Sequence, residues 1–192
     1  MNQPKILAFG GSLRAASFNH QAAALAAAAA REAGAEVTLI SLRDYPLPLF
    51  DQDLEAASGM PESARKLKAL FLAHDGLIIA SPEYNSTISA ALKNAIDWVS
   101  RATAADEPPL AALAGKTAAI LAASPGGYGG SRGLAQLRPF LENIRVSVIE
   151  PQVTIPKAHE LTGPDGAFVD QEVIQAVHAL GKSLVAAMQK TE

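Results

Sequence analysis

Three short segments of the chain concentrate residues able to bind a ligand. The first loop, residues 10–19, reads Gly-Gly-Ser-Leu-Arg-Ala-Ala-Ser-Phe-Asn and leads into an alanine-rich run. Its Ser12, Arg14, Ser17 and Asn19 supply hydroxyl, guanidinium and amide donors beside the free N–H groups of a predicted helix N-terminus. This donor set favours binding of a phosphate. The alternative is that Ser17 or Asn19 only caps the helix while Arg14 is a solvated surface charge.

The spacing of the glycines in the first loop argues against two common nucleotide-binding motifs. It matches neither the Gly-x-Gly-x-x-Gly of dinucleotide-binding folds nor the Gly-x-x-x-x-Gly-Lys-Ser/Thr of P-loop proteins. A Rossmann dehydrogenase and a P-loop NTPase are therefore disfavoured. The phosphomonoester end of a cofactor fits this loop better.

The second loop, residues 81–87, reads Ser-Pro-Glu-Tyr-Asn-Ser-Thr and follows a wholly apolar run. Pro82 stiffens the loop, Tyr84 offers a face for a planar ring, and Asn85 can bond a ring edge. The alternative is a helix-capping turn with Tyr84 on the surface. We expect Glu83 to be a solvated loop carboxylate without a catalytic role.

The third loop, residues 124–132, reads Ser-Pro-Gly-Gly-Tyr-Gly-Gly-Ser-Arg. Its glycines let the backbone approach a ligand closely and present N–H groups, because no Cβ atom stands in the way. The alternative is a flexible turn, which is weakened by the entropy that ordering so many glycines costs. A bound ring or a gating motion would offset that cost.

Apolar runs without polar alternation precede the three loops and recur along the chain. With helical segments between them, they predict a parallel sheet covered by helices on both faces. The predicted strands are residues 5–9, 36–40, 76–80, 117–123 and 145–149. The predicted helices are residues 18–33, 62–73, 88–100, 131–141 and 170–188, and the predicted loops are residues 102–109 and 151–166.

The fold class predicted from this pattern is a three-layer α/β sandwich with a five-stranded parallel sheet. A length of 192 residues favours one domain over residues 1–192. In strand order 2-1-3-4-5, the loops after strands one, three and four lie side by side, at the edge where ligands bind to such sheets. These are the three loops described above.

Composition narrows the choice of partners. A net charge of -3 gives no basic excess for nucleic acid or anionic lipid, and the chain has no cysteine for a disulfide, a thiolate metal site or a nucleophile. The apolar stretch 22–30 is far shorter than the roughly 20 residues of a membrane span, so a cytoplasmic location is predicted. No metal site is predicted, because Asp51 and Asp53 lack a third ligand and the histidines are scattered: His20, His74, His159 and His178.

The motifs Gly-Ser-Leu-Arg-x-x-Ser-x-Asn, Ser-Pro-Glu-Tyr-Asn, Leu-Lys-Asn-Ala-Ile-Asp-Trp and Ser-Pro-Gly-Gly-x-Gly-Gly occur here in that order. Together with the Pro-Leu-Pro-Leu-Phe-Asp-Gln-Asp segment at residues 46–53, they resemble the NADPH-dependent FMN reductase family from residue 6 to about residue 143. The resemblance implies a flavodoxin-like fold, bound FMN, and NADPH or NADH as electron donor. It also implies small-molecule acceptors (flavins, quinones, azo dyes or chromate) and a homodimer or homotetramer.

Carried over residue by residue, the resemblance divides the cofactor site between the three loops. Hydride chemistry belongs to FMN in this family, so no side chain is assigned as catalytic. Arg132 is a weak candidate for a 2'-phosphate contact. Leu13 is a further cofactor-binding residue of the first loop. The phosphate is assigned to Ser12, Arg14, Ser17 and Asn19, one edge of the isoalloxazine ring to Pro82, Glu83, Tyr84 and Asn85, and its other flank to Ser124, Gly126, Gly127 and Gly129.

One residue departs from the family pattern, and one alternative function stays open. Ser89 stands where family members commonly have proline, and its presence predicts a looser start of the following helix. The alternative function is a flavodoxin-like electron-transfer protein that binds FMN without oxidising a nicotinamide. Such carriers usually have a more acidic surface than a net charge of -3 provides, so the enzyme is preferred.

Overall fold

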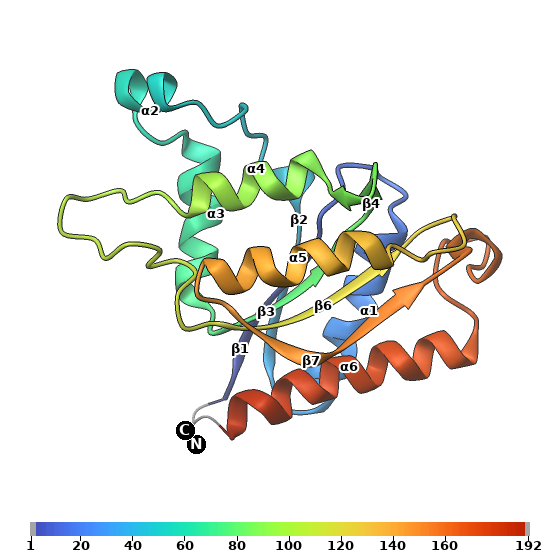
Figure 1. Ribbon diagram of the computed structural model, residues 1–192. Helices are drawn as coiled ribbons and strands as arrows, with labels where there is room; N and C mark the ends of the chain where they lie inside the picture. Colours follow the sequence, from blue (N-terminus) through green and yellow to red (C-terminus); the bar gives the residue numbers. More distant parts are fainter. Residues whose placement is uncertain (1–2, 191–192) are drawn as a thin grey trace.

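Five parallel strands form the centre of the computed structural model, which describes residues 3–190 (Figure 1). The sheet has the order β2-β1-β3-β6-β7, and β4 and β5 pair only with each other, so the predicted order 2-1-3-4-5 is confirmed. The ends of the predicted domain, residues 1–2 and 191–192, lie outside the described residues. The strands are β1 (Lys5–Gly10), β2 (Glu36–Ser41), β3 (Gly76–Ala80), β6 (Thr117–Ala123) and β7 (Ser147–Ile155).

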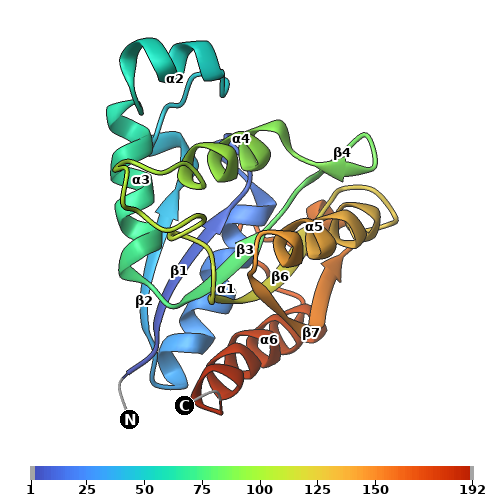
Figure 2. The same ribbon diagram turned by 60° about the vertical axis from the view of Figure 1, so that its left-hand side comes forward.

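Helices cover both faces of the sheet, as predicted, because the side chains of each central strand alternate between two apolar clusters (Figures 1 and 2). Leu7 and Phe9 of β1 face one cluster, and Ile6 and Ala8 face the other. The first cluster is covered by α3 (Glu62–Ala73), α4 (Ala90–Val99) and α5 (Ser131–Asn143), and the second by α1 (Phe18–Glu32) and α6 (Gln171–Gln189).

One strand differs from its prediction. A strand was expected at residues 145–149, but β7 extends from Ser147 to Ile155. The loop predicted at residues 151–166 therefore begins only after Ile155. Since β7 is an edge strand, proline's missing N–H leaves no ladder bond unmade on its open side. The guanidinium of Arg138 donates to the carbonyl oxygens of Val148, Ile149 and Glu150, which stabilises the strand where its register to β6 shifts.

Several short elements were not predicted, and several predicted helix boundaries moved by one or two residues. The helix expected from residue 88 begins at Ala90, after a two-stranded hairpin. No helix within residues 3–190 is long and apolar enough to cross a membrane. The unpredicted elements are η1 (Leu42–Asp44), α2 (Gln52–Ser58), β4 (Glu83–Tyr84), β5 (Thr87–Ile88) and η2 (Ala158–Glu160).

A buried lysine fixes the predicted loop after α4, which has no regular helix or strand at residues 102–109. Lys68 of α3 is 2% exposed, and its ammonium donates to the carbonyl oxygen of Arg101 and to the carboxylate of Glu107. A buried ammonium is stable only when its donors are satisfied. This contact therefore ties the C-terminal end of α4 to α3.

The Glu107 carboxylate makes stability depend on pH. Its hydrogen bond from Lys68 is the largest cause that lowers the pKa of Glu107 from 4.5 to about 2. Because the folded-state pKa is the lower one, the stabilisation is present above pH 4.5 and is lost as the pH falls toward 2. We expect Glu107→Gln to lower the melting temperature near neutral pH and to weaken its further fall on acidification, measured by circular dichroism.

A matched control is Glu142→Gln, because the Glu142 carboxylate is half-exposed and lies 4.0 Å from Arg138. We expect this variant to keep the wild-type acid sensitivity. Equal acid sensitivity of Glu107→Gln and the wild type would contradict the assignment.

Candidate functional site

The three loops meet at the carboxyl edge of the sheet because the strand ladders continue beyond the strands. Gly10 pairs with Ala80, and the next N–H, that of Gly11, donates to the carbonyl oxygen of Ala80 at 2.8 Å. In the same way, Ser81 N–H donates to the carbonyl oxygen of Leu121 at 2.8 Å. The first and second loops therefore leave the sheet side by side, next to the end of β6.

A cavity of about 60 Å³ lies between the three loops. Most of the predicted site residues line it, whereas Leu13, Asn85 and the glycines of the third loop do not. Its walls also include Phe18, Ala123 and Pro125, which the sequence did not single out. The predicted residues that it brings together are Ser12, Arg14, Ser17, Asn19, Pro82, Glu83, Tyr84 and Ser124.

The first loop presents donors at the N-terminus of α1. The hydroxyl oxygens of Ser12 and Ser17 accept from the N–H groups of Arg14 and His20, each at 3.2 Å, so their own O–H groups are left to donate. Ser17 is thus the N-cap of α1, as the alternative interpretation expected. A Cβ atom on Gly10 would lie 2.8 Å from the backbone nitrogen of His20, so only glycine allows this approach.

The Asn19 side chain links α1 to the end of β6. Its amide donates to the carbonyl oxygen of Ala123 at 2.8 Å, and its Oδ1 accepts from the N–H of Ala123 at 2.9 Å. The side chain is buried. One amide N–H is left for a ligand, so the predicted phosphate contact of Asn19 depends on that single donor.

Glu83 was expected to be solvated, and this expectation is wrong. Its side chain is 8% exposed, and its carboxylate accepts from Arg132 at 2.8 and 2.9 Å and from the N–H of Gly133 at 3.0 Å. The short β4–β5 hairpin lies against the start of α5 and brings these groups together (Figure 2). Arg132, considered for a 2'-phosphate, holds this carboxylate and lies 4.6 Å from the Tyr128 ring centroid.

Tyr84 and Asn85 both line a cavity beside the hairpin, but only Tyr84 also lines the cavity between the loops. Tyr84 is half-exposed and lines the cavity between the loops. Asn85 and Ser86 have left-handed φ values of 52° and 66°, which form the turn. Asn85 lines a second cavity of about 620 Å³ between the hairpin, α4 and α5, together with Phe140.

The third loop packs against residues 155–157 on one side and is open on the side of Gly127. The carbonyl oxygen of Gly126 accepts from Lys157 N–H at 3.1 Å, and Gly129, with φ of 58°, leaves no room for a Cβ atom beside Pro156. A Cβ atom on Gly127 would meet no atom within 4 Å. Gly127 therefore faces open space, and a planar group can approach its backbone closely.

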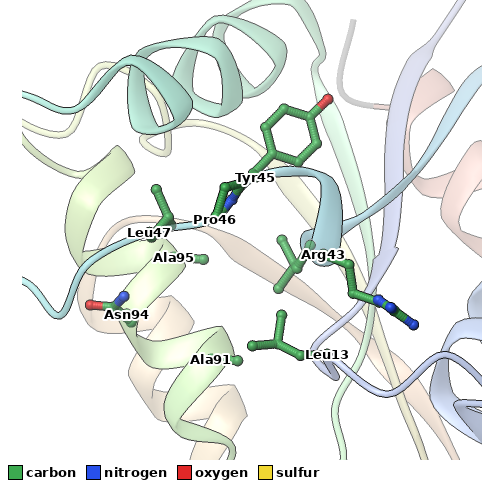
Figure 3. Close-up of a pocket in the computed structure, with 9 residues that line it drawn as sticks. Leu13, Arg43, Tyr45, Pro46, Leu47, Ala91, Asn94 and Ala95 are labelled. Carbon is green, nitrogen blue, oxygen red and sulfur yellow. The ribbon is translucent and has the colours of Figure 1, made fainter.

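Leu13 lies on the other side of the first loop. It lines a third cavity of about 260 Å³ with residues of η1, the following segment and α4. Figure 3 shows Leu13 facing Ala91 of α4, whereas the guanidinium of Arg43 points away. Leu13, predicted to bind the cofactor, therefore does not line the cavity between the loops.

Ser89 was expected to loosen the start of α4, and this expectation is also wrong. It caps α4 by accepting from Leu92 N–H at 3.1 Å, and it also donates to the carbonyl oxygen of Gly11. The side chain is fully buried. The helix start is therefore capped and not loosened, and a serine directly before an apolar helical run was the signal for it.

The electrostatics of the cavity suit a phosphate. Among the hydrogen bonds and ion pairs of residues 3–190, none engages the guanidinium of Arg14 or the N–H groups of Ser12, Phe18 and Asn19. The α1 dipole adds partial positive charge, and its first turn holds no acidic residue. Since Arg132 neutralises Glu83, the donor set fits a phosphate dianion such as that of FMN.

Comparison with known proteins agrees with this donor set. The sequence profile of the NADPH-dependent FMN reductase family matches residues 4–160. An NAD(P)H-dependent FMN reductase of Pseudomonas aeruginosa is 34% identical over 174 residues, which cover 90% of this chain and 89% of that protein. A 2-hydroxy-1,4-benzoquinone reductase of a Burkholderia species is 33% identical over 169 residues, covering 88% of this chain and 87% of that protein.

A solved structure extends the similarity to the whole fold. The flavoenzyme NAD(P)H:(acceptor) oxidoreductase FerB of Paracoccus denitrificans superposes with a TM-score of 0.80 at 26% identity, covering 97% of this chain and 98% of that one. An archaeal flavodoxin, at 11% identity and a TM-score of 0.63, shares the fold alone. The chain therefore belongs to the NADPH-dependent FMN reductase family and is an oxidoreductase that uses FMN and NAD(P)H.

Proposed function

We propose that the first loop binds the FMN phosphate and that the second and third loops hold the isoalloxazine ring. The observation that carries the proposal is the cavity between the three loops, which gathers hydroxyl, guanidinium and backbone donors at the N-terminus of α1. The hydroxyl groups of Ser12 and Ser17 donate hydrogen bonds to the phosphate, and the Arg14 guanidinium supplies a positive charge. Asn19 contributes its remaining amide N–H, and Leu13 is a further cofactor-binding residue, through its backbone.

The ring has two walls in this proposal. On one side lie Pro82, Glu83, Tyr84 and Asn85, with the rings of Pro82 and Tyr84 giving apolar area and the carboxylate of Glu83 withdrawn onto Arg132. On the other side, Ser124, Gly126, Gly127 and Gly129 present backbone without side-chain obstruction. Asn85 reaches the ring through its backbone, because its side chain lines the neighbouring cavity.

When bound, FMN would supply the hydride-transfer chemistry between NAD(P)H and a second substrate. The chain's own residues bind the cofactor, orient it and leave one face accessible at the open side of the third loop. No side chain is assigned as acid, base or nucleophile. The ionisable groups lining the cavity are Arg14, Glu83 and Tyr84, and the carboxylate of Glu83 is already engaged.

The proposed function is tested by the visible spectrum of the purified, FMN-reconstituted protein under anaerobic conditions. We expect the flavin bands to bleach on addition of NADPH or NADH, and the faster donor identifies the preferred nicotinamide. Bands that persist with both donors would favour the electron-transfer protein. Failure to retain FMN would overturn the proposed site.

The phosphate assignment predicts that Arg14→Ala weakens FMN binding by about 1.5 to 3 kcal/mol, the range for a hydrogen bond to a charged group. Isothermal titration with FMN measures the loss. The control is Arg43→Ala, because Arg43 lines the cavity around Leu13 and not the one between the loops. Unchanged FMN affinity in Arg14→Ala would contradict the assignment.

Quinones are the acceptors that we propose first, with flavins, azo compounds and chromate as further substrates. Quinone reduction is the activity named for the Burkholderia relative. A planar quinone can stack on an exposed flavin face, as a nicotinamide does, so one slot serves both substrates in turn. This alternation predicts ping-pong kinetics. We also propose a cytoplasmic location, where NAD(P)H is available.

We further propose a homodimer or homotetramer. Cavities of about 260 and 620 Å³ open on either side of α4, and Leu13 and Tyr84, which line them, are large exposed hydrophobic residues. Apolar surface of this kind marks interaction sites in many proteins. Native mass spectrometry should give a multiple of 19.9 kDa. A species at 19.9 kDa alone, at micromolar concentration, would contradict the proposal.

A further inference from the structure

We propose that Asn19, Glu83 and Ser89 are positioning residues that join the three loops into a closed ring of side-chain tethers. Each of the three side chains connects a different pair of loops, so every pair is connected. The inference rests on the proposed function, because it concerns the distance between the phosphate and ring subsites. The closing experiment distinguishes the failure of the two proposals.

Ser89 connects the first loop to the second. Its hydroxyl donates to the carbonyl oxygen of Gly11, while its oxygen accepts from Leu92 N–H and begins α4 directly behind the second loop. A trans peptide holds its C=O and N–H in opposite directions. Fixing the Gly11 oxygen on Ser89 therefore directs the N–H of Ser12 away from α4, and a Cβ atom on Gly11 would lie only 3.0 Å from Leu92.

Glu83 connects the second loop to the third. Its carboxylate bonds Arg132, the last residue of the third loop, and the N–H of Gly133 in the first turn of α5. A Cβ atom on Gly133 would lie 3.3 Å from the Cβ of Glu83, so the backbones are in close contact there. The carboxylate is held at both oxygens, Oε1 by two guanidinium nitrogens of Arg132 and Oε2 by Gly133 N–H, so its direction as well as its distance is fixed.

Asn19 closes the ring between the first loop and the third. Its amide makes two hydrogen bonds with Ala123, the residue that precedes the third loop, and thereby imitates a neighbouring strand. Ala123 is 3% exposed, so losing Asn19 would leave a buried backbone N–H and C=O unpaired. Asn19 thus uses one of its two amide N–H groups and its carbonyl oxygen to join the loops, and the other N–H is left for a ligand.

A closed ring has a specific consequence. Removal of one tether leaves all three loops connected through the other two, whereas removal of two tethers leaves one loop held to its neighbours by backbone hydrogen bonds alone. The tethers therefore fix the distance between the phosphate subsite and the ring subsite, and they affect the internal geometry of each subsite less. Misplacement of one subsite weakens only a ligand that spans both.

The experiment compares FMN, riboflavin and inorganic phosphate, titrated against the wild type and Ser89→Ala. FMN spans both subsites, riboflavin reaches only the ring subsite, and phosphate reaches only the first loop. We expect Ser89→Ala to weaken FMN binding about tenfold while riboflavin and phosphate affinities change less than about twofold. Ser89→Thr, which keeps the hydroxyl, should restore the FMN affinity.

The matched control is Asp170→Ala, which removes the N-cap of α6 without touching the ring. It should lower the melting temperature by an amount similar to Ser89→Ala and leave the preference for FMN over riboflavin unchanged. A wild type that binds no FMN would refute the proposed function. A wild type that binds FMN with an unchanged FMN-to-riboflavin preference in Ser89→Ala would refute the ring.

Glu83→Gln keeps the test decisive if Ser89→Ala unfolds, because it opens a different tether and should lower FMN affinity while riboflavin and phosphate affinities change less than about twofold. Equal losses of FMN and riboflavin affinity in this variant would overturn the ring.

Glu83→Gln keeps an acceptor for Gly133 N–H and removes the ion pair with Arg132. We expect the Ser89→Thr/Glu83→Gln protein to lose no more FMN affinity than Glu83→Gln. If Ser89→Ala folds, the loss in Ser89→Ala/Glu83→Gln should exceed the product of the single losses, because the second loop then has no side-chain tether to either neighbour. A multiplicative double loss would overturn the closed ring.

Discussion

Parallel strand pairing that continues past the last residues of β1 and β3 is the constraint on which the site depends. Gly11 bonds to Ala80 and Ser81 bonds to Leu121, so each chain segment leaves the sheet already aligned with its neighbour. The Asn19 amide extends the same pattern to Ala123 with side-chain atoms. Helix α1 therefore begins at a fixed height above the sheet, and its N-terminal N–H groups point into the space between the loops.

The charged side chains at this edge of the sheet must also be compatible with a bound anion. A free carboxylate beside an anion site would repel the anion, since the two like charges would interact in a partly desolvated environment. Glu83 avoids this because both of its oxygens are bonded, one of them to a guanidinium. The same residue thus serves the packing of the hairpin on α5 and the electrostatics of the cavity.

The sequence was sufficient for the strand order and for the location of the site, because buried parallel strands are uniform apolar runs and loops with glycine and hydroxyl residues follow them. It was insufficient where a residue's role depends on distant partners. Pro151 indicates a loop, but a proline is also tolerated in an edge strand such as β7. Glu83 would be solvated if the hairpin did not bring it into contact with Arg132. Ser89 bonds to Gly11, which is 78 residues away in the sequence. Which donors of Asn19 are free likewise depends on Ala123, 104 residues away.

These sequence separations also bear on the order in which the molecule folds. The three side-chain tethers close chain segments of 49, 78 and 104 residues, and contacts that close long segments cost more entropy than the local turns of α1 or α6. Each tether joins segments that lie at or beyond the carboxyl ends of two of the strands β1, β3 and β6, so the complete set depends on the pairing of all three. The cleft between the loops is therefore complete only when these strands have paired. Cofactor retention accordingly reports on the pairing of the central strands.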